Sequence, residues 1–179
     1  MRCSSVCAEV ADAPVSPCWS PVGRHGHSAI ITSVNHCAVN VGRLVEIRAN
    51  AGYRSADDVD VIFGLIGREL AKVPSSKRVV VVTDWRRCPI MSDAASERML
   101  SMLTRSNPRV ERSAALASPD SPLAVLQFMR LIRESKHPDR RLFNAALEAC
   151  EWLAPVLTEA EQQRLRAFLE LPVDATSET

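Results

Sequence analysis

The stretch VVVVTDWRRCPIMSDAASERML, Val79 to Leu100, decides the fold class of this 179-residue chain. It begins with four consecutive valines and no polar alternation, which is typical of a strand covered on both faces of a sheet. The run ends at Asp84 and a basic turn. Ser92 and Asp93 then start a helix, since serine is a preferred N-cap and an acidic residue suits the first turn. A buried strand that leads into a helix predicts an α/β domain.

On the N-terminal side of this stretch, two strand-like runs precede a helix. Residues 29–39 and 43–49 have strand-like composition and are separated by Asn-Val-Gly at 40–42, so we expect an antiparallel hairpin. Residues 53–74 change to a helical period, and Ser55 with an acidic residue three positions later forms a capping-box signature. The apolar face of this helix is expected to contain Val59, Ile62, Phe63, Ile66 and Leu70.

On the C-terminal side, helices and strands continue to alternate. The expected elements are a helix from near Ser92 to Asn107-Pro108, a strand over 110–118, a helix opened by Ser121 and Pro122, a strand over 140–143, a helix capped by Asn144 and a helix from Thr158. Their inward faces are expected to contain Ala95, Met99, Met102 and Leu103, then Val125, Phe128, Met129 and Ile132, and finally Leu165, Phe168 and Leu169. We therefore predict an α/β fold with a mixed sheet of about five strands. It starts with an antiparallel hairpin, continues with strands alternating with helices, and ends with a C-terminal helix.

The chain divides into three predicted parts. Residues 1–27 combine prolines and small residues without sustained periodicity, which predicts a disordered leader. Residues 28–157 hold the α/β domain, and residues 158–179 hold the C-terminal helix and a short acidic tail. No segment reaches the roughly 18 consecutive apolar residues of a membrane span, and no apolar run suits a signal peptide. We therefore expect a cytoplasmic protein.

Charge and cysteine spacing argue against two classes of binding site. The 22 basic and 21 acidic side chains nearly cancel, so the basic excess expected of a nucleic-acid-binding protein is missing. A zinc site could be assembled from Cys3, Cys7, Cys18, His25 and His27, but no two cysteines form the C-x-x-C pair typical of structural zinc sites. We expect reduced thiols and no metal.

Motifs for catalysis are missing from the sequence. It has no G-x-S-x-G, no glycine-rich phosphate loop and no H-E-x-x-H, so we expect neither a cofactor nor enzymatic activity. His36 falls on a predicted strand, where a structural histidine is expected rather than a catalytic base.

Two segments carry a resemblance to a known family. KHPDRRLFNAALEACEWLAP, Lys136 to Pro155, has an Arg-x-Phe strand and a short helix that ends in Trp-Leu, and VERSAALASPDSPLAVLQFMRLI, Val110 to Ile132, precedes it. Together they resemble the SpoIIAA-like branch of the STAS family, the sulphate-transporter and anti-sigma-factor-antagonist domains. The similarity spans about residues 29 to 157. It implies a non-enzymatic protein-interaction module in bacterial signalling or regulation.

The resemblance also gives meaning to the turn after the third strand. In anti-sigma-factor antagonists this strand ends in Asp, and an Asp-Ser-Ser-Gly run with a phosphorylated serine opens the next helix. Here Asp84 ends the strand, while Ser92, Asp93, Ala94 and Ala95 occupy the matching run, with serine and aspartate transposed. The residues alone indicate a helix cap. The candidate switch or interaction surface, expected to meet a protein partner, comprises Asp84, Arg86, Arg87, Ser92 and Asp93.

Three classes of function remain open from the sequence. The first is the interaction module. The second is a small-molecule or lipid-binding domain of the CRAL-TRIO kind, which a related branch resembles and which a large apolar cavity under the helices would favour. The third is an uncharacterised enzyme, which a cleft joining His or Cys to a carboxylate would favour.

Two further residue groups have alternative interpretations. Arg140 and Arg141 are expected at a solvated or ion-paired surface, with an anion site as the alternative. Trp152 is expected to pack in the core, with a role in stacking on a ligand as the alternative.

Overall fold

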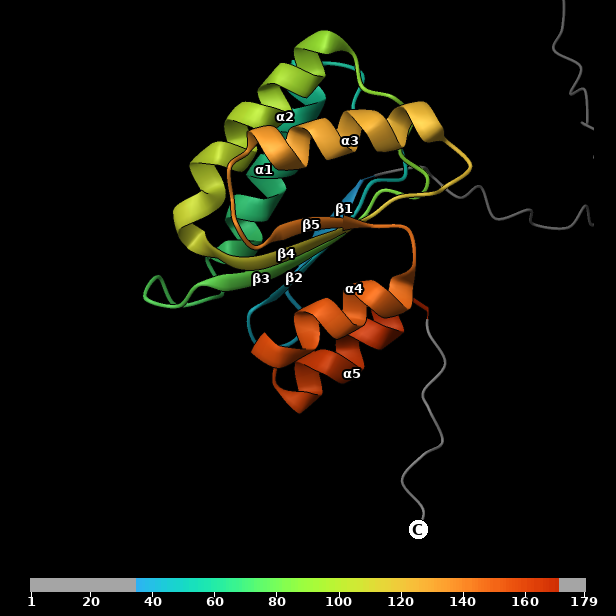
Figure 1. Ribbon diagram of the computed structural model, residues 1–179. Coiled ribbons are helices and arrows are strands. Elements are labelled where there is room, and N and C mark those ends of the chain that lie inside the picture. The colour runs from blue at the N-terminus through green and yellow to red at the C-terminus, as the bar shows by residue number, and fades with distance from the viewer. Residues whose placement is uncertain (1–34, 171–179) are drawn as a thin grey trace, which may run out of the picture. The chain divides into compact units, whose positions relative to one another are not determined.

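The computed structural model describes residues 35–170, and these form a sheet with helices on both faces (Figure 1). The predicted leader and the acidic end of the chain lie outside the described residues. The elements are β1 (His36–Ala38), β2 (Leu44–Arg48), α1 (Ala56–Leu70), β3 (Val79–Asp84), α2 (Asp93–Ser106), β4 (Val110–Leu116), α3 (Pro122–Glu134), β5 (Arg140–Phe143), α4 (Ala146–Leu153) and α5 (Glu159–Phe168), with short 3₁₀ turns at Asn107–Arg109 and Ala154–Val156.

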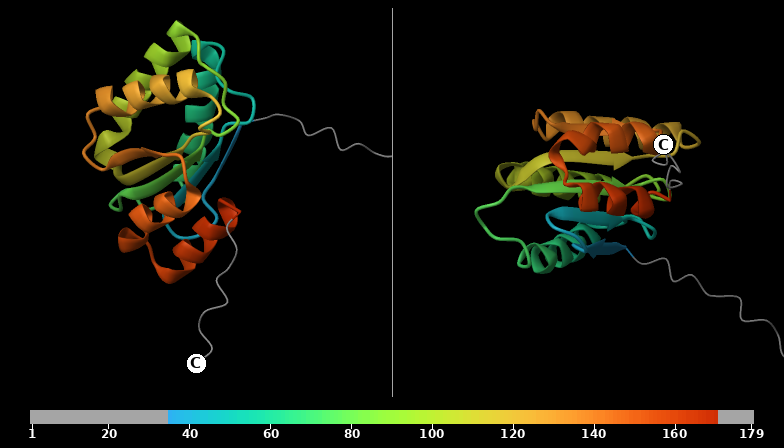
Figure 2. Two further views of the ribbon diagram at one scale, coloured as in Figure 1. Left: turned by 45° about the vertical axis from the view of Figure 1, so that its right-hand side comes forward. Right: turned by 90° about the horizontal axis from the view of Figure 1, so that it is seen from below.

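The sheet confirms the predicted α/β class and the predicted hairpin. Its five strands lie in the order β1-β2-β3-β4-β5, with β1 antiparallel to β2 and the other neighbours parallel. Crossover connections between parallel strands have one preferred hand, so strands laid down in chain order place their helices on one face. Accordingly α1, α2 and α3 cover one face, and α4 and α5 cover the other (Figures 1 and 2).

The valine run of β3 contributes to both cores, as its lack of polar alternation predicts. Val79 packs in the cluster under α1, α2 and α3, whereas Val80 and Val82 pack in the cluster under α4 and α5. Strand alternation therefore divides the run between two layers of helices. The same alternation points Asp84 to the face that carries α4 and α5, because it lies an even number of residues from Val82.

Four predicted N-cap positions are confirmed, and one is wrong. Ser55 and Thr158 form capping boxes, and the Ser92 side chain accepts a hydrogen bond from the Ala95 amide. Ser121 occupies the N-cap of α3 with Pro122 after it, but its side chain makes no cap bond. Asn144 does not cap α4: the N-cap position falls on Ala145, because the chain is still extended there, one residue later than predicted.

The inward face of α3 differs from the prediction in one position. Ala124, Phe128 and Leu131 are its buried residues, while Met129 is 53% exposed. Successive helical residues are about 100° apart, so a face centred on Phe128 turns Met129 outward. By contrast, Leu165, Phe168 and Leu169 of the last helix are all buried, as predicted.

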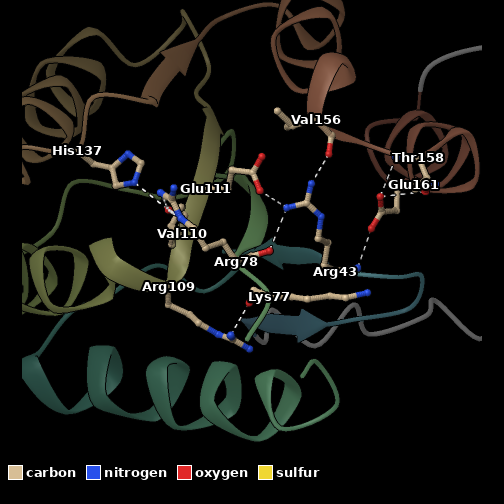
Figure 3. Close-up of polar contacts among 10 residues, drawn as sticks. All are labelled: Arg43, Lys77, Arg78, Arg109, Val110, Glu111, His137, Val156, Thr158 and Glu161. Carbon is tan, nitrogen blue, oxygen red and sulfur yellow. Dashed lines mark hydrogen bonds and ion pairs between the residues drawn. The ribbon is translucent and has the colours of Figure 1, made fainter. Parts of the chain in front are cut away.

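The amino-terminal ends of the parallel strands are held together by polar contacts (Figure 3). Arg43, just before β2, donates to the Arg78 carbonyl at 3.0 Å, to Glu111 and to the Val156 carbonyl. The Arg43 amide also donates to the Glu161 carboxylate at 2.7 Å. These bonds connect the α4–α5 layer to the amino-terminal ends of the strands, so this end of the sheet has a structural role.

Candidate functional site

Asp84 ends β3 and is fixed by its neighbours. It is buried, and its carboxylate accepts bonds from the Arg86 amide at 3.1 Å, from Arg86 Nε at 3.0 Å and from Arg86 Nη2 at 2.8 Å. Arg48 lies 3.6 Å from the same carboxylate. Burial alone would raise the pKa of Asp84, but the Arg86 bonds and the two cationic charges outweigh it and lower the pKa. Asp84 is thus a paired carboxylate.

The turn after Asp84 is anchored by two buried side chains, and one of its arginines is exposed. Trp85 and Cys88 are buried, and the Trp85 ring lies 4.6 Å from the Phe128 ring of α3. The Cys88 amide donates to the Trp85 carbonyl at 2.9 Å, which closes the turn. Arg87, between them, is exposed. Of the two arginines predicted here, Arg86 is paired and Arg87 faces solvent.

Ser92 and Asp93 start α2 beside α3. Both are exposed, and the Ser92 hydroxyl accepts the Ala95 N–H at 3.2 Å. The preceding residue, Met91, is fixed by two bonds: its amide donates to Gln127 Oε1 at 2.8 Å, and Gln127 Nε2 donates to its carbonyl at 2.9 Å. The start of α2 is therefore held rigidly against α3.

The contacts place four of the five predicted surface residues in two separate groups. Asp84 and Arg86 belong with Arg48, which also donates to the Phe168 carbonyl at 2.6 Å and pairs with Glu170 at the end of α5. Ser92 and Asp93 instead lie beside α3, on the other side of the sheet. Among residues 35–170, no hydrogen bond or ion pair joins the two groups.

An exposed apolar surface lies next to Ser92 and was not predicted. We call it the α3 surface. Its members are Ile90 (51% exposed), Leu123 (67%), Leu126 (62%) and Met129 (53%). The three α3 residues follow one another at intervals of three positions, so they form a continuous stripe on the helix. The Met91–Gln127 bonds bring the loop that carries Ile90 to this helix.

The sequence did contain a signal for this surface. Residues 123–132 read LAVLQFMRLI, and eight of these ten residues are apolar. A helix that buries one face needs about half as many, so the excess must be exposed or meet a partner. The helix-cap signal at Ser92 does not indicate this surface.

An acidic groove of about 300 Å³ borders the α3 surface, between α2 and α3. Asp93, Glu97 and Glu134 supply its carboxylates, and Arg130 is its basic residue. Arg130 Nε is 2.9 Å from Glu134 Oε1, so that arginine is already paired. The groove therefore presents a net negative charge beside apolar side chains, and Asp93 belongs to it.

Trp152 packs against two arginines. The Arg141 and Arg112 guanidinium carbons lie 3.6 Å and 4.3 Å from its ring centroid, and Arg112 donates to the Trp152 carbonyl at 2.8 Å. Its neighbour Leu153 is fully buried. Cation–π contacts with side chains of the same domain occupy this ring, in agreement with a packing role.

The buried cysteines and the buried histidine are held in their neutral forms. Cys37, Cys88 and Cys150 are free and buried, and burial raises the pKa of Cys37 and of Cys88 to about 12. The structural histidine is His137, which is buried, whereas His36 is exposed. Within residues 35–170 no group of three His, Cys, Asp or Glu side chains is placed to hold a metal ion. The predicted zinc candidates, Cys3 to His27, lie outside the described residues.

Comparisons with known proteins give one structural likeness. No protein-family model matches this sequence, and no curated protein matches it. The chain is similar to the crystal structure of an uncharacterized protein of the DUF3478 family, with a SpoIIAA-like fold, from Shewanella loihica PV-4. The two are 16% identical, with a TM-score of 0.49, over 67% of this chain and 95% of the other. Among the described helices, none is long and apolar enough to cross a membrane.

Proposed function

We propose that this chain is a non-enzymatic protein-interaction module, of the STAS kind, in a signalling or regulatory assembly. The α3 surface is the observation that carries the proposal. Four large apolar side chains, each more than half exposed, lie on one helix and the loop attached to it. A gathering of exposed apolar residues marks interaction sites on soluble proteins far more often than single ones do.

The charge beside the α3 surface selects the partner. Asp93, Glu97 and Glu134 line the adjoining groove, and its one arginine is paired with Glu134. A complementary partner presents an amphipathic segment whose apolar residues cover Leu123 and Leu126 and whose flank carries Lys or Arg. Such pairing gives specificity and faster association, while the apolar contacts supply most of the affinity.

Ser92 and Asp93 lie at the edge of this proposed interface. Asp93 contributes a fixed negative charge to the groove, and Ser92 is exposed at the start of the same helix. A phosphoryl group on Ser92 would add negative charge there and strengthen attraction to a basic partner segment. The run from Ser92 to Ala95, which matches the phosphorylated segment of the family with serine and aspartate transposed, thus lies at the edge of the surface proposed here.

Binding, rather than catalysis, is favoured by the state of the nucleophiles. The thiols of Cys37 and Cys88 are buried and stay protonated at neutral pH, because burial raises their pKa to about 12. His137 uses both ring nitrogens in bonds to the backbone. Lipid binding is disfavoured by size, since the cavity under the helices measures about 80 Å³.

The test is a comparison of two equally exposed apolar residues. Leu126 on α3 is 62% exposed and Val61 on α1 is 65% exposed. Leu126→Lys should abolish capture of the specific partner from native lysate, whereas Val61→Lys should leave it intact. Glu97→Lys should weaken the same complex, measured by calorimetry with the purified partner, because it reverses a charge in the groove.

Three results would contradict the proposal. Equal capture by wild type, Leu126→Lys and Val61→Lys would move the interface away from α3. A complex that gains affinity on Glu97→Lys would show that the partner is acidic. A concentration-dependent dimer that Leu126→Lys converts to a monomer, seen by light scattering, would show that a second copy of this chain covers the surface.

A further inference from the structure

A cavity of about 80 Å³ lies between the sheet and the layer formed by α1, α2 and α3. Most of its wall is apolar, with Val45, Ile47 and Val81 from the strands and Ile62, Ile66 and Met99 from the helices. One end is polar, where Ser106, Ser113 and Arg140 line it. The cavity therefore has an apolar body and a cationic end.

Strand register places the two polar side chains side by side. Ser113 on β4 is the direct partner of Arg140 on β5, and Val81 on β3 is the partner of Ser113. Partners on neighbouring strands point to the same face, so the row from Val81 to Arg140 leads from the apolar part of the cavity to its charged end.

Arg140 is buried without a counter-charge. Arg140 is 5% exposed, and its Nε and Nη1 atoms have no hydrogen-bond partner within residues 35–170. Nη2 has only two long contacts, 3.4 Å to Ser106 Oγ and 3.5 Å to the Leu103 carbonyl. Burial lowers its pKa to about 10. No ion pair among the described residues includes it.

An arginine in this state favours an anion. Burying a charged group without a partner costs several kcal/mol, and buried polar groups in native proteins are nearly always hydrogen-bonded. A carboxylate matches the planar guanidinium and is the anion that also carries an aliphatic group into an apolar cavity. Arg141, the next residue, makes a useful contrast, since it is exposed and stacks on Trp152.

The volume limits the size of the anion. An apolar cavity of about 150 Å³ holds benzene, so a cavity near half that size accommodates roughly three to five non-hydrogen atoms. Acetate and propionate have this size, whereas a fatty acid does not. Entry is available beside α3, because Ile132 and Arg140 line both the cavity and a surface groove that Met129 and Leu142 also line.

We propose that Arg140 and the cavity behind it bind a short aliphatic monocarboxylate of two or three carbons. The carboxylate accepts hydrogen bonds from the free guanidinium donors and from the Ser113 hydroxyl. The alkyl group extends along the sheet toward Val81 and Val45. This site lies in the core, behind the α3 surface, and Met129 belongs both to that surface and to the groove at the cavity entrance, so the chain would combine a small-molecule site with an adjoining protein-binding face.

The experiment is an NMR titration of the full ¹⁵N-labelled chain with sodium propionate, compared with sodium chloride at the same concentration. Propionate should give saturable shifts at the Ser113 and Arg140 amides, and chloride should not. Arg140→Met, which keeps the volume but removes the charge, should weaken propionate binding about 10- to 100-fold. Arg141→Met is the matched control and should bind propionate like wild type.

Wild-type measurements alone also decide the proposal, should Arg140→Met fold poorly. Propionamide has the same shape without the charge and should not saturate, and octanoate should bind at least 10-fold more weakly than propionate because it exceeds the cavity. Equal shifts with chloride or with propionamide would overturn carboxylate recognition. Tighter binding of octanoate would place its alkyl group in the outer groove instead of the cavity. Undiminished propionate binding by Arg140→Met would show that Arg140 is not part of the site.

Discussion

At the scale of single residues, Gly42 shows how one backbone position supports a distant helix. Its φ is +56°, in the left-handed region, and a Cβ there would collide with the Glu161 carboxylate of α5. That carboxylate accepts the Arg43 amide and caps α5 through Thr158. Burial alone would raise the pKa of Glu161, but these bonds and the Arg43 charge lower it. The turn and the helix therefore depend on each other.

Gly42→Ala should consequently lower the free energy of unfolding by about 2–4 kcal/mol, from left-handed strain and weakened bonds to Glu161. Gly64→Ala is its control. Gly64 lies in α1 with no atom near the added Cβ, so this change should be neutral or stabilise by about 0.5–1 kcal/mol. Urea unfolding of both variants measures the difference. Equal midpoints would show that the Gly42 turn relaxes without cost.

Ser92 tests the distinction between a cap and a switch. Because its hydroxyl accepts the Ala95 amide, Ser92→Ala should lower the free energy of unfolding by about 1 kcal/mol, and Ser92→Asp should preserve it. If the α3 surface is the interface, Ser92→Asp should also increase the affinity for the basic partner without changing the free energy of unfolding. A stability loss of the same size for both variants would mean that the hydroxyl is not acting as a cap.

At the scale of elements, local signals located the helices and strands but not all their faces. The capping boxes at Ser55 and Thr158 need only residues three positions apart, so the sequence identifies them directly. The prediction of Asn144 as a cap failed because pairing with β4 ends β5 at Phe143, and two residues follow before the first helical residue, so the N-cap falls on Ala145. The orientation of α3 failed for a similar reason, since its rotation is set by packing against Trp85.

The last helix, α5, is expected to stabilise the domain through its buried stripe. Leu165 is 1% exposed and belongs to the core under α4 and α5, so Leu165→Ala should lower the free energy of unfolding by about 2–5 kcal/mol. Leu147→Ala, on the neighbouring helix α4 at 51% exposure, is the matched control and should cost less than about 1 kcal/mol. Chemical denaturation of the two variants gives the comparison. Similar losses would indicate that α5 detaches without affecting the rest.

At the scale of the whole molecule, strand direction and pairing determine what the sequence could reveal about the sites. Asp84 and Ser92 are eight positions apart, yet the side-chain alternation of β3 sends Asp84 toward α5 while the loop carries Ser92 toward α3. Arg140 was expected at a surface because its neighbours in sequence are charged. Its position beside Ser113 depends on register between strands 27 positions apart, which no local pattern encodes.

The same long-range packing gives the molecule a pH dependence through His137. His137 Nε2 lies 3.1 Å from the Val110 carbonyl of β4 (Figure 3), and Nδ1 accepts the Asp139 amide at 3.1 Å. The bond from Asp139 requires an unprotonated Nδ1 and hence the neutral ring, whose proton lies on Nε2, where it is donated to Val110. Burial lowers the pKa of His137 below its usual 6.5. The bond to the Val110 carbonyl opposes this, but the charges of Arg140 and Arg78 lower the pKa further, and Asp139 raises it only slightly.

Stability should therefore fall as the pH decreases below about 6.5, where the unfolded chain binds a proton that the folded chain does not. The slope from this group cannot exceed about 1.4 kcal/mol per pH unit, and it levels off below the folded pKa. Asp84 and Glu161 act in a different window, because carboxyl groups with lowered pKa values lose their contribution only as the pH falls below about 4.5. His137→Gln keeps a donor for Val110 and does not titrate, so thermal unfolding between pH 7.5 and pH 5 should show a flatter profile than wild type. An unchanged profile in the variant would assign the pH dependence to other groups.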